Sequence, residues 1–258
     1  MTENEKNDFQ NIALLIDAEN TPHTSMKDVI EEISKFGRIV IKRAYADWHT
    51  CDDKTAKALN DLAIKAVQQF SFIKGKNTSD FALYIDAMDL LHENQYDAFA
   101  IVSSDSDFSP LAIRLKESGV FVIGVGGISK TIPAFRNACS KFISLENLSK
   151  NEISKETTEN QKTISDKNSE TDKIHIEEIH DLLKKFAAEE KYQDSEGFVR
   201  LSDSITYITR VRSDFNVKDF GFKKSSDFLN GFPSLYEIKK EQGKGTVTII
   251  KYRVKDAN

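Results

Sequence analysis

The feature that most constrains the fold is an alternation of short apolar runs with segments of helical periodicity through the first 145 residues. The helical segments cover residues 25–37, 52–70, 79–94, 109–119 and 130–139. The apolar runs cover residues 11–17, 38–47, 71–74, 96–104, 120–126 and 141–145. Strands that alternate with helices predict a mainly parallel sheet with helices on both faces, an α/β fold in three layers. Continuous apolar runs are typical of such doubly covered strands.

The second half of the chain has a different pattern. Amphipathic helices are predicted at 173–190, within 198–215 and within 219–232. Two alternating segments around Gly243-Lys244-Gly245 predict a β-hairpin. Three helices and a hairpin indicate a small winged-helix domain of the α+β class.

Between the two halves, the composition changes. Residues 151–171 contain no aromatic side chain and only two large apolar ones, Ile153 and Ile164. Such a segment cannot bury enough surface to offset its ordering entropy, so we expect a flexible linker. The predicted domains are therefore residues 1–150 and 172–258, with the linker at 151–171.

Charge and composition narrow the function classes. The net charge of −5 argues against unspecific coating of nucleic acid, but residues 197–226 carry six basic groups against three acidic ones. That local excess, which includes Lys223 and Lys224, predicts a contact with nucleic acid. No apolar stretch is long enough for a membrane span, and residues 1–10 lack the features of a secretory signal. The two cysteines lack the spacing of a metal site. We therefore expect a cytoplasmic protein that binds no membrane.

Four aspartates are predicted to meet at one edge of the sheet. Asp17 ends the first apolar run, Asp105 and Asp107 follow the run at 96–104, and Asp80 opens the helix at 79–94. Ligands of open α/β sheets bind beyond the carboxyl ends of the strands, which is where these acids fall. Carboxylates packed together need a cation, and oxygen ligands without His or Cys favour Mg²⁺ or Mn²⁺ over Zn²⁺. The chemistry that such a site predicts is hydrolysis of a phosphodiester.

Each acid also has a simpler interpretation. Asp17, Asp105 and Asp107 fit turn positions, and Asp80 fits the first turn of a helix, where a negative charge is favourable. Asn20 either holds a water on the metal or caps a helix.

Three further residues near these acids are weaker candidates. Asp86 is a secondary candidate, because it lies about 120° around the helix from Asp80. Lys74 and Lys76 either contact substrate phosphates or are simply solvated.

The stretches ALLIDAEN, KGKNTSDFALYIDAMDLL and AIVSSDSDFSPLAIRLKESG resemble the NYN domain, a branch of the PIN-like nucleases, over about residues 9–148. The resemblance implies a PIN-like fold and a ribonuclease that depends on Mg²⁺ or Mn²⁺. Its acidic positions correspond to Asp17, Asp80, Asp105 and Asp107, with Asn20 and Asp86 in support. Ser104 and Ser106 stand where the family often has glycine, which alters the backbone near the last acid pair and keeps both acids.

The stretches IHDLLKKFAAEE, DSEGFVRLSDSITYI and DFGFKKSSDFLNGFPSLYEI resemble the OST-HTH or LOTUS domain over about residues 173–254. The resemblance implies RNA binding, in some members to G-rich or structured RNA, and in others protein partners. The phenylalanines of this region are expected in its core: Phe220, Phe222, Phe228 and Phe232.

The leading hypothesis is a metal-dependent endoribonuclease whose C-terminal domain binds single-stranded or structured RNA. A second is a catalytically weak RNA-binding or adaptor protein that retains the acidic pocket. A third, a phosphatase of the haloacid-dehalogenase type, is disfavoured because Glu19 stands where that family has aspartate. The sequence leaves open the RNA target, RNA versus DNA, endonuclease versus exonuclease, the choice of metal, a homodimer, and a protein partner of the C-terminal domain.

Overall fold

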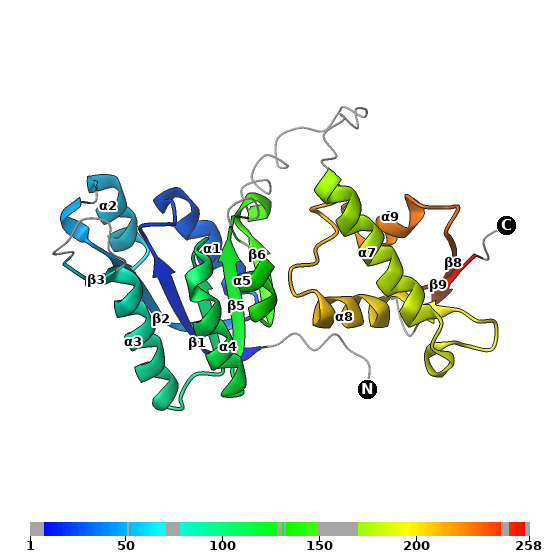
Figure 1. Ribbon diagram of the computed structural model, residues 1–258, viewed down its shortest axis with the longest axis horizontal. Coiled ribbons are helices and arrows are strands. Elements are labelled where there is room, and N and C mark those ends of the chain that lie inside the picture. Colours follow the sequence, from blue (N-terminus) through cyan, green and yellow to red (C-terminus); the bar gives the residue numbers. More distant parts are fainter. Residues whose placement is uncertain are drawn as a thin grey trace. The chain divides into compact units, whose positions relative to one another are not determined.

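The computed structural model describes residues 8–50, 52–70, 78–127, 131, 133–148, 170–243 and 248–255. The chain divides into two compact units, Met1–Thr157 and Thr158–Asn258 (Figure 1). The division falls inside the predicted linker at 151–171, which lies outside the described residues as far as residue 169. The domain limits drawn from the sequence remain a proposal.

The first unit is built on a six-stranded sheet with the order β3-β2-β1-β4-β5-β6 (Figure 1). Every neighbouring pair is parallel. The strands are β1 (Phe9–Asp17), β2 (Gly37–Ala46), β3 (Lys65–Gln68), β4 (Ala98–Val102), β5 (Phe121–Gly126) and β6 (Lys141–Ser144). The chain reverses its direction of travel across the sheet between β1 and β4, and such a switch point is where α/β sheets bind ligands.

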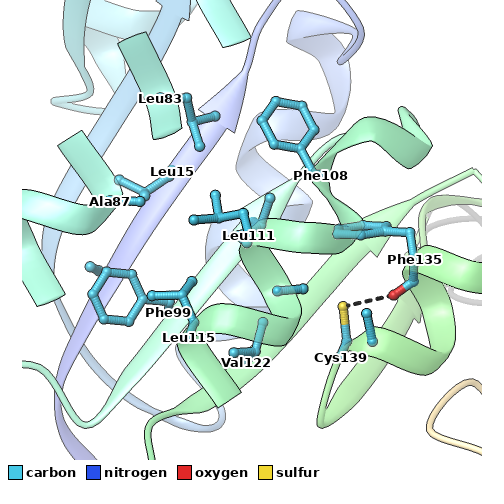
Figure 2. Close-up of a cluster of buried hydrophobic side chains, with 14 of the residues drawn as sticks. Leu15, Leu83, Ala87, Phe99, Phe108, Leu111, Leu115, Val122, Phe135 and Cys139 are labelled. Atoms are coloured by element: carbon cyan, nitrogen blue, oxygen red, sulfur yellow. Dashed lines mark hydrogen bonds between the residues drawn. The ribbon is translucent and has the colours of Figure 1, made fainter. Parts of the chain in front are cut away.

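Helices cover both faces of this sheet, so the predicted three-layer α/β architecture is confirmed. On one face, α3, α4 and α5 pack on the sheet through Leu83, Leu111, Leu115 and Phe135 (Figure 2). On the other face, α1 and α2 pack through Met26, Val29, Ile33 and Leu59. The helices are α1 (Met26–Ile33), α2 (Asp53–Asp61), α3 (Thr78–His92), α4 (Ser109–Glu117) and α5 (Pro133–Ala138). The described residues of this unit also form three 3-10 turns: η1 (His23–Ser25), η2 (Trp48–Thr50) and η3 (Ser106–Phe108).

One predicted helix is wrong in its second half. The sequence predicts a helix over residues 52–70, but α2 ends at Asp61 and β3 follows within that range. Ala63 takes a left-handed conformation with φ 51°, and Ile64 N–H donates to the Leu59 carbonyl at 2.8 Å. This is a Schellman end, with Ile64 and Leu59 buried in the same core cluster. The strand predicted at 71–74 lies outside the described residues.

Where the structure describes it, the second unit contains three α-helices and a small antiparallel sheet of order β7-β9-β8, which confirms the predicted α+β pattern. Its core includes Phe228, and the other three phenylalanines expected there pack against it, as predicted. The elements are α7 (Glu170–Ala187), η4 (Glu190–Tyr192), β7 (Val199–Arg200), α8 (Leu201–Val211), α9 (Ser225–Asn230), β8 (Tyr236–Gln242) and β9 (Thr248–Val254). Within the described ranges of both units, no helix is both long and apolar enough to cross a membrane.

Candidate active site

The predicted acids come from three separate segments at the carboxyl edge of the sheet. Asp17 is the last residue of β1, Asp105 follows β4 and caps η3, and Asp80 lies in the first turn of α3. β1 and β4 are neighbours, with Ile16 opposite Val102. The acids therefore lie at the switch point of the sheet.

Asp80 carries the clearest sign that these carboxylates interact. Its pKa is raised from 3.8 to about 6, first by burial and then by the negative charges of Asp17, Asp105, Glu19 and Asp107. Like charges raise the pKa of a carboxyl group because they disfavour its ionised form. The structure thus brings the four predicted aspartates into one electrostatic group and adds Glu19.

Asp17 is held in place by its neighbours. Its side chain is buried, with 1% exposed, and its Oδ2 accepts hydrogen bonds from Ser103 Oγ at 2.6 Å and Asn20 Nδ2 at 2.8 Å. Its Oδ1 accepts one longer bond, from Asn20 N–H at 3.3 Å, and so keeps capacity for another partner. Burial is the main cause of the raised pKa of Asp17, and these hydrogen bonds oppose it. Asn20 therefore orients Asp17, and α1 begins after a different residue, Ser25.

The loop after β4 is tied to Asp17 through one hydroxyl group. Ser103 Oγ donates to Asp17 and accepts from Asp105 N–H at 3.0 Å. Asp105 Oδ1 accepts from Asp107 N–H at 2.9 Å, so Asp105 is also the N-cap of η3. Asp105 can cap η3 and also bind a metal ion, because the cap uses only one of its two carboxylate oxygens. Sequence reasoning missed Ser103, whose position directly after a buried strand was the available signal.

Tyr84 connects α3 to the same loop, and sequence reasoning missed it as well. It lies one turn after Asp80, and its hydroxyl group donates to the backbone carbonyl of Asp107. Its ring stacks on Phe108, with the ring centres 5.5 Å apart and the planes at 18°. Burial is the first cause of its raised pKa, followed among the raising causes by Asp107, Asp80 and Asp105. Tyr84 thus links the segment that carries Asp80 to the segment that carries Asp105 and Asp107.

Asp86 is engaged elsewhere. One carboxylate oxygen accepts from the Arg43 guanidinium and the other accepts from the Tyr45 hydroxyl. The pKa of Tyr45 is raised, first by burial and then by its bond to Asp86. The structure therefore gives Asp86 a role in joining α3 to β2 and does not bring it into the group around Asp80.

Glu19 is the added member of the acidic group. It is exposed, and its Oε1 accepts from Asp47 N–H at 3.1 Å, which fixes the side chain above the end of β2. Its charge raises the pKa of both Asp17 and Asp80. Its place two residues after Asp17 was the signal available in the sequence.

The donor set decides which cation these residues could hold. Among the described residues, no three His, Cys, Asp or Glu side chains are already gathered closely enough to hold a metal ion. The chemical type of these side chains nevertheless fits a hard divalent cation, because all their donor atoms are oxygen. The raised pKa of Asp80 also favours a cation at this site, because a positive charge there would offset the repulsion between the carboxylates.

The predicted RNA-binding lysines fall into two groups. Lys74 and Lys76 lie outside the described residues. Lys223 and Lys224 are both exposed, immediately before α9. Of the basic residues in 197–226, Arg212 forms ion pairs with Glu178 and Asp214, whereas the other five are exposed: Arg200, Arg210, Lys218, Lys223 and Lys224.

The family comparison agrees with the acidic edge. The NYN domain matches residues 11–146, just over half of the chain. The chain belongs to the NYN domain family. NYN domains are part of the PIN-like nuclease superfamily, whose members typically use divalent metals. An OST-HTH/LOTUS domain, which is an RNA-binding class, matches residues 173–248. Both resemblances noted in the sequence are thereby confirmed.

Two further proteins are similar to this NYN protein. An uncharacterized protein from Methanocaldococcus jannaschii is 29% identical over 138 residues, which cover 52% of this chain and 55% of the relative. The chain thus spans about half the length of that relative. A crystal structure of a protein of unknown function from Vibrio parahaemolyticus matches with a TM-score of 0.47 and 19% identity, over 57% of this chain and 98% of that one. A likeness of that size carries no argument about function.

Proposed function

We propose that the NYN domain is a ribonuclease that hydrolyses RNA phosphodiesters endonucleolytically with Mg²⁺ or Mn²⁺. The residues that would hold the cation are Asp17, Asp80, Asp105 and Asp107, with Asn20 in support. The observation that carries the proposal is that carboxylates from the end of β1, the loop after β4 and the first turn of α3 come together at the switch point of the sheet, and the raised pKa of Asp80 supports it. Carboxyl groups with strongly perturbed pKa values cluster at functional sites.

The protein supplies a fixed frame for this chemistry. Ser103 and Asn20 hold Asp17, and the N–H of Asp107 holds Asp105, so each of these two carboxylates keeps one oxygen with spare capacity. Carboxylates that are oriented in advance need little reorganisation when a ligand arrives. When bound, Mg²⁺ or Mn²⁺ would supply positive charge for the phosphodiester and lower the pKa of an attacking water. With a pKa of about 6, Asp80 is mostly ionised at neutral pH and becomes protonated as the pH falls below that value.

The C-terminal domain is proposed to supply affinity for single-stranded or structured RNA, including G-rich RNA. Its support is the set of five exposed basic residues named above, which no ion pair neutralises within the described residues. Lys74 and Lys76 remain proposed phosphate contacts of the NYN domain. A cytoplasmic location, a homodimer and a protein partner remain predictions.

The proposal is tested by comparing the wild type with Asp105→Asn on labelled single-stranded, hairpin and G-rich RNAs. Each reaction is run with Mn²⁺, with Mg²⁺ and with chelator. The matched control is Asp61→Asn, which changes an exposed acid at the end of α2. We expect cleavage that needs a cation, that is lost in Asp105→Asn with RNA binding retained, and that the control keeps.

Two results would contradict the proposal in different ways. Equal cleavage by Asp105→Asn and the wild type would show that the acids are not the site. RNA binding without cleavage under any cation would favour the adaptor function.

The role of the second domain is tested by Lys223→Gln combined with Lys224→Gln in the full chain. These changes should weaken RNA binding, lower its salt dependence and leave the cation requirement unchanged.

A further inference from the structure

A groove separate from the acidic group runs between α3 and β3. Its volume is about 520 Å³, and none of the four predicted aspartates of the site lines it. One wall comes from α3 and includes Ala82 and Ile85, and the other comes from the end of β3 and includes Val67. The remaining lining residues are Arg43, Lys65, Ala66, Gln68, Gln69, Asp86 and Asp89.

The charge of this groove suits an uncharged ligand. Its two basic residues are balanced by two acidic ones, and the Arg43 guanidinium is bound by Asp86. A phosphate group would find no net positive charge there. An uncharged planar ring with polar edges fits better, because Ala82, Ile85 and Val67 supply apolar walls and Gln69 supplies an amide. An amide both donates and accepts, which is the pattern that reads the edge of a nucleobase.

Exposed apolar side chains mark both sides of the groove. Ile85 and Phe81 on α3 are 63% and 68% exposed, and Phe81 is next to Ala82 in the chain. Phe70, which follows Gln69, is 52% exposed and stacks on His49, with the ring centres 5.3 Å apart. Exposed apolar side chains grouped beside a groove indicate a binding surface, and aromatic faces stack on bases of any sequence.

The groove and Asp80 share α3 but lie on different faces of it. Ala82 and Ile85 follow Asp80 by two and five residues, which corresponds to rises of about 3 Å and about 7.5 Å along the axis and to rotations of about 160° and about 140° around it. An RNA strand with a phosphodiester at Asp80 must therefore pass around α3 for a nearby base to enter the groove.

We propose that this groove is a subsite for one unpaired nucleobase of the RNA strand whose phosphodiester lies at the acidic group. The inference rests on the proposed function and deepens it, since a base inside the groove cannot be paired. The NYN domain therefore selects single-stranded RNA or the loops of structured RNA, independently of the C-terminal domain.

The chain contains a local probe for this subsite. Trp48 is its single tryptophan. The Trp48 indole N–H donates to the Val67 carbonyl at 2.8 Å, and its backbone N–H donates to Gln68 Oε1 at 3.0 Å. Both of these partners line the groove. A base that enters the groove should therefore change the fluorescence of Trp48, whereas RNA held only by the C-terminal domain should not.

The full chain is titrated in chelator, where cleavage is absent, with a short single-stranded oligoribonucleotide and with the same sequence as a blunt duplex. We expect a saturable change in Trp48 fluorescence with the single strand and none with the duplex. Ile85→Asp and, separately, Gln69→Ala should weaken the affinity that Trp48 reports, the first by at least about fivefold. The control Ile113→Asp, at an exposed position on α4, should leave it unchanged.

A series of oligonucleotides with one abasic position each then locates the base. One position should weaken binding to the wild type at least about fivefold and have no effect on Ile85→Asp. RNA binding by anisotropy without a Trp48 response, equal responses to single strand and duplex, or equal effects of Ile85→Asp and Ile113→Asp would each overturn the subsite. A normal Trp48 response in a protein that never cleaves RNA would contradict the proposed function alone.

Discussion

Replacing Asp80 by asparagine should stabilise the NYN domain at neutral pH. The pKa of Asp80 in the folded protein is about 6, above the ordinary value of 3.8, mainly because of burial and then because of neighbouring carboxylates. Between these two pH values the folded state binds more protons than the unfolded state, so stability falls as pH rises through the window. The penalty is complete above about pH 7 and absent below about pH 4. The asparagine variant lacks it and keeps nearly the same shape.

The magnitude follows from the size of the shift. For a fully buried group, a rise in pKa from 3.8 to about 6 would give an upper bound of about 3 kcal/mol. Asp80 is only partly buried, and solvent screening reduces such interactions, so we expect a stabilisation of about 1 kcal/mol. In a protein of this size, that corresponds to a rise in Tm of about 2–4 °C.

The assay is thermal unfolding from pH 4 to pH 8 in chelator, followed by the fluorescence of Trp48, which lies in the same compact unit as Asp80. Wild type, Asp80→Asn and the control Asp61→Asn are compared. The Tm of Asp80→Asn should exceed that of the wild type at pH 7.5 and equal it near pH 4. Mn²⁺ should close the gap by stabilising the wild type. A variant that is no more stable at pH 7.5, or a difference in Tm that does not change with pH, would contradict the assigned cause of the instability.

Three further predictions concern other residues. Asp86→Asn should lower the Tm, because Arg43 and Tyr45 lose a charged partner worth about 1–3 kcal/mol, and should leave Mn²⁺ affinity by calorimetry unchanged. A loss of Mn²⁺ affinity without a loss of Tm would return Asp86 to the ligand set. Tyr84→Phe keeps the stacked ring and removes the hydroxyl group, so cleavage should slow about fivefold with little change in Tm, and an unchanged rate would remove Tyr84 from the site. Burial lowers the pKa of His180, whose Nδ1 lies 2.7 Å from the Tyr236 hydroxyl, so the unfolded state binds the proton more readily. The second unit should therefore lose stability as the pH falls below about 6.5. Amide hydrogen exchange in α7, corrected for the intrinsic exchange rates, should then be faster at pH 5. A corrected rate that does not increase at pH 5 would contradict this prediction.

The sequence predicted most of the fold because hydrophobic periodicity survives without tertiary information. β1, β2, β4 and β5 lie where their apolar runs indicated, and parallel strands necessarily bring their carboxyl ends to one edge. That topology is why the sequence alone could place Asp17 and Asp105 in one group. β3 was missed because the left-handed residue just after α2 is Ala63, whereas a glycine at that position would have indicated the end of the helix.

The contacts that organise the site were not readable in the same way. Ser103 meets Asp17 across 86 residues of sequence, and Tyr84 meets Asp107 across 23. Such pairs depend on strand register and helix rotation, which periodicity does not specify. The spacing of Asp80 and Asp86 did place them on different faces of one helix, but the partner that Asp86 finds, Arg43, follows only from the packing of α3 on β2.

The most direct test of the proposed metal site is Mn²⁺ anomalous diffraction from crystals of the full chain soaked in MnCl₂. We expect a peak in contact with carboxylate oxygens of Asp17, Asp80 and Asp105, which disappears in crystals of Asp105→Asn. Saturating Mn²⁺ that gives no ordered peak at these carboxylates, in crystals of a protein that cleaves RNA in solution, would contradict the assignment of the site.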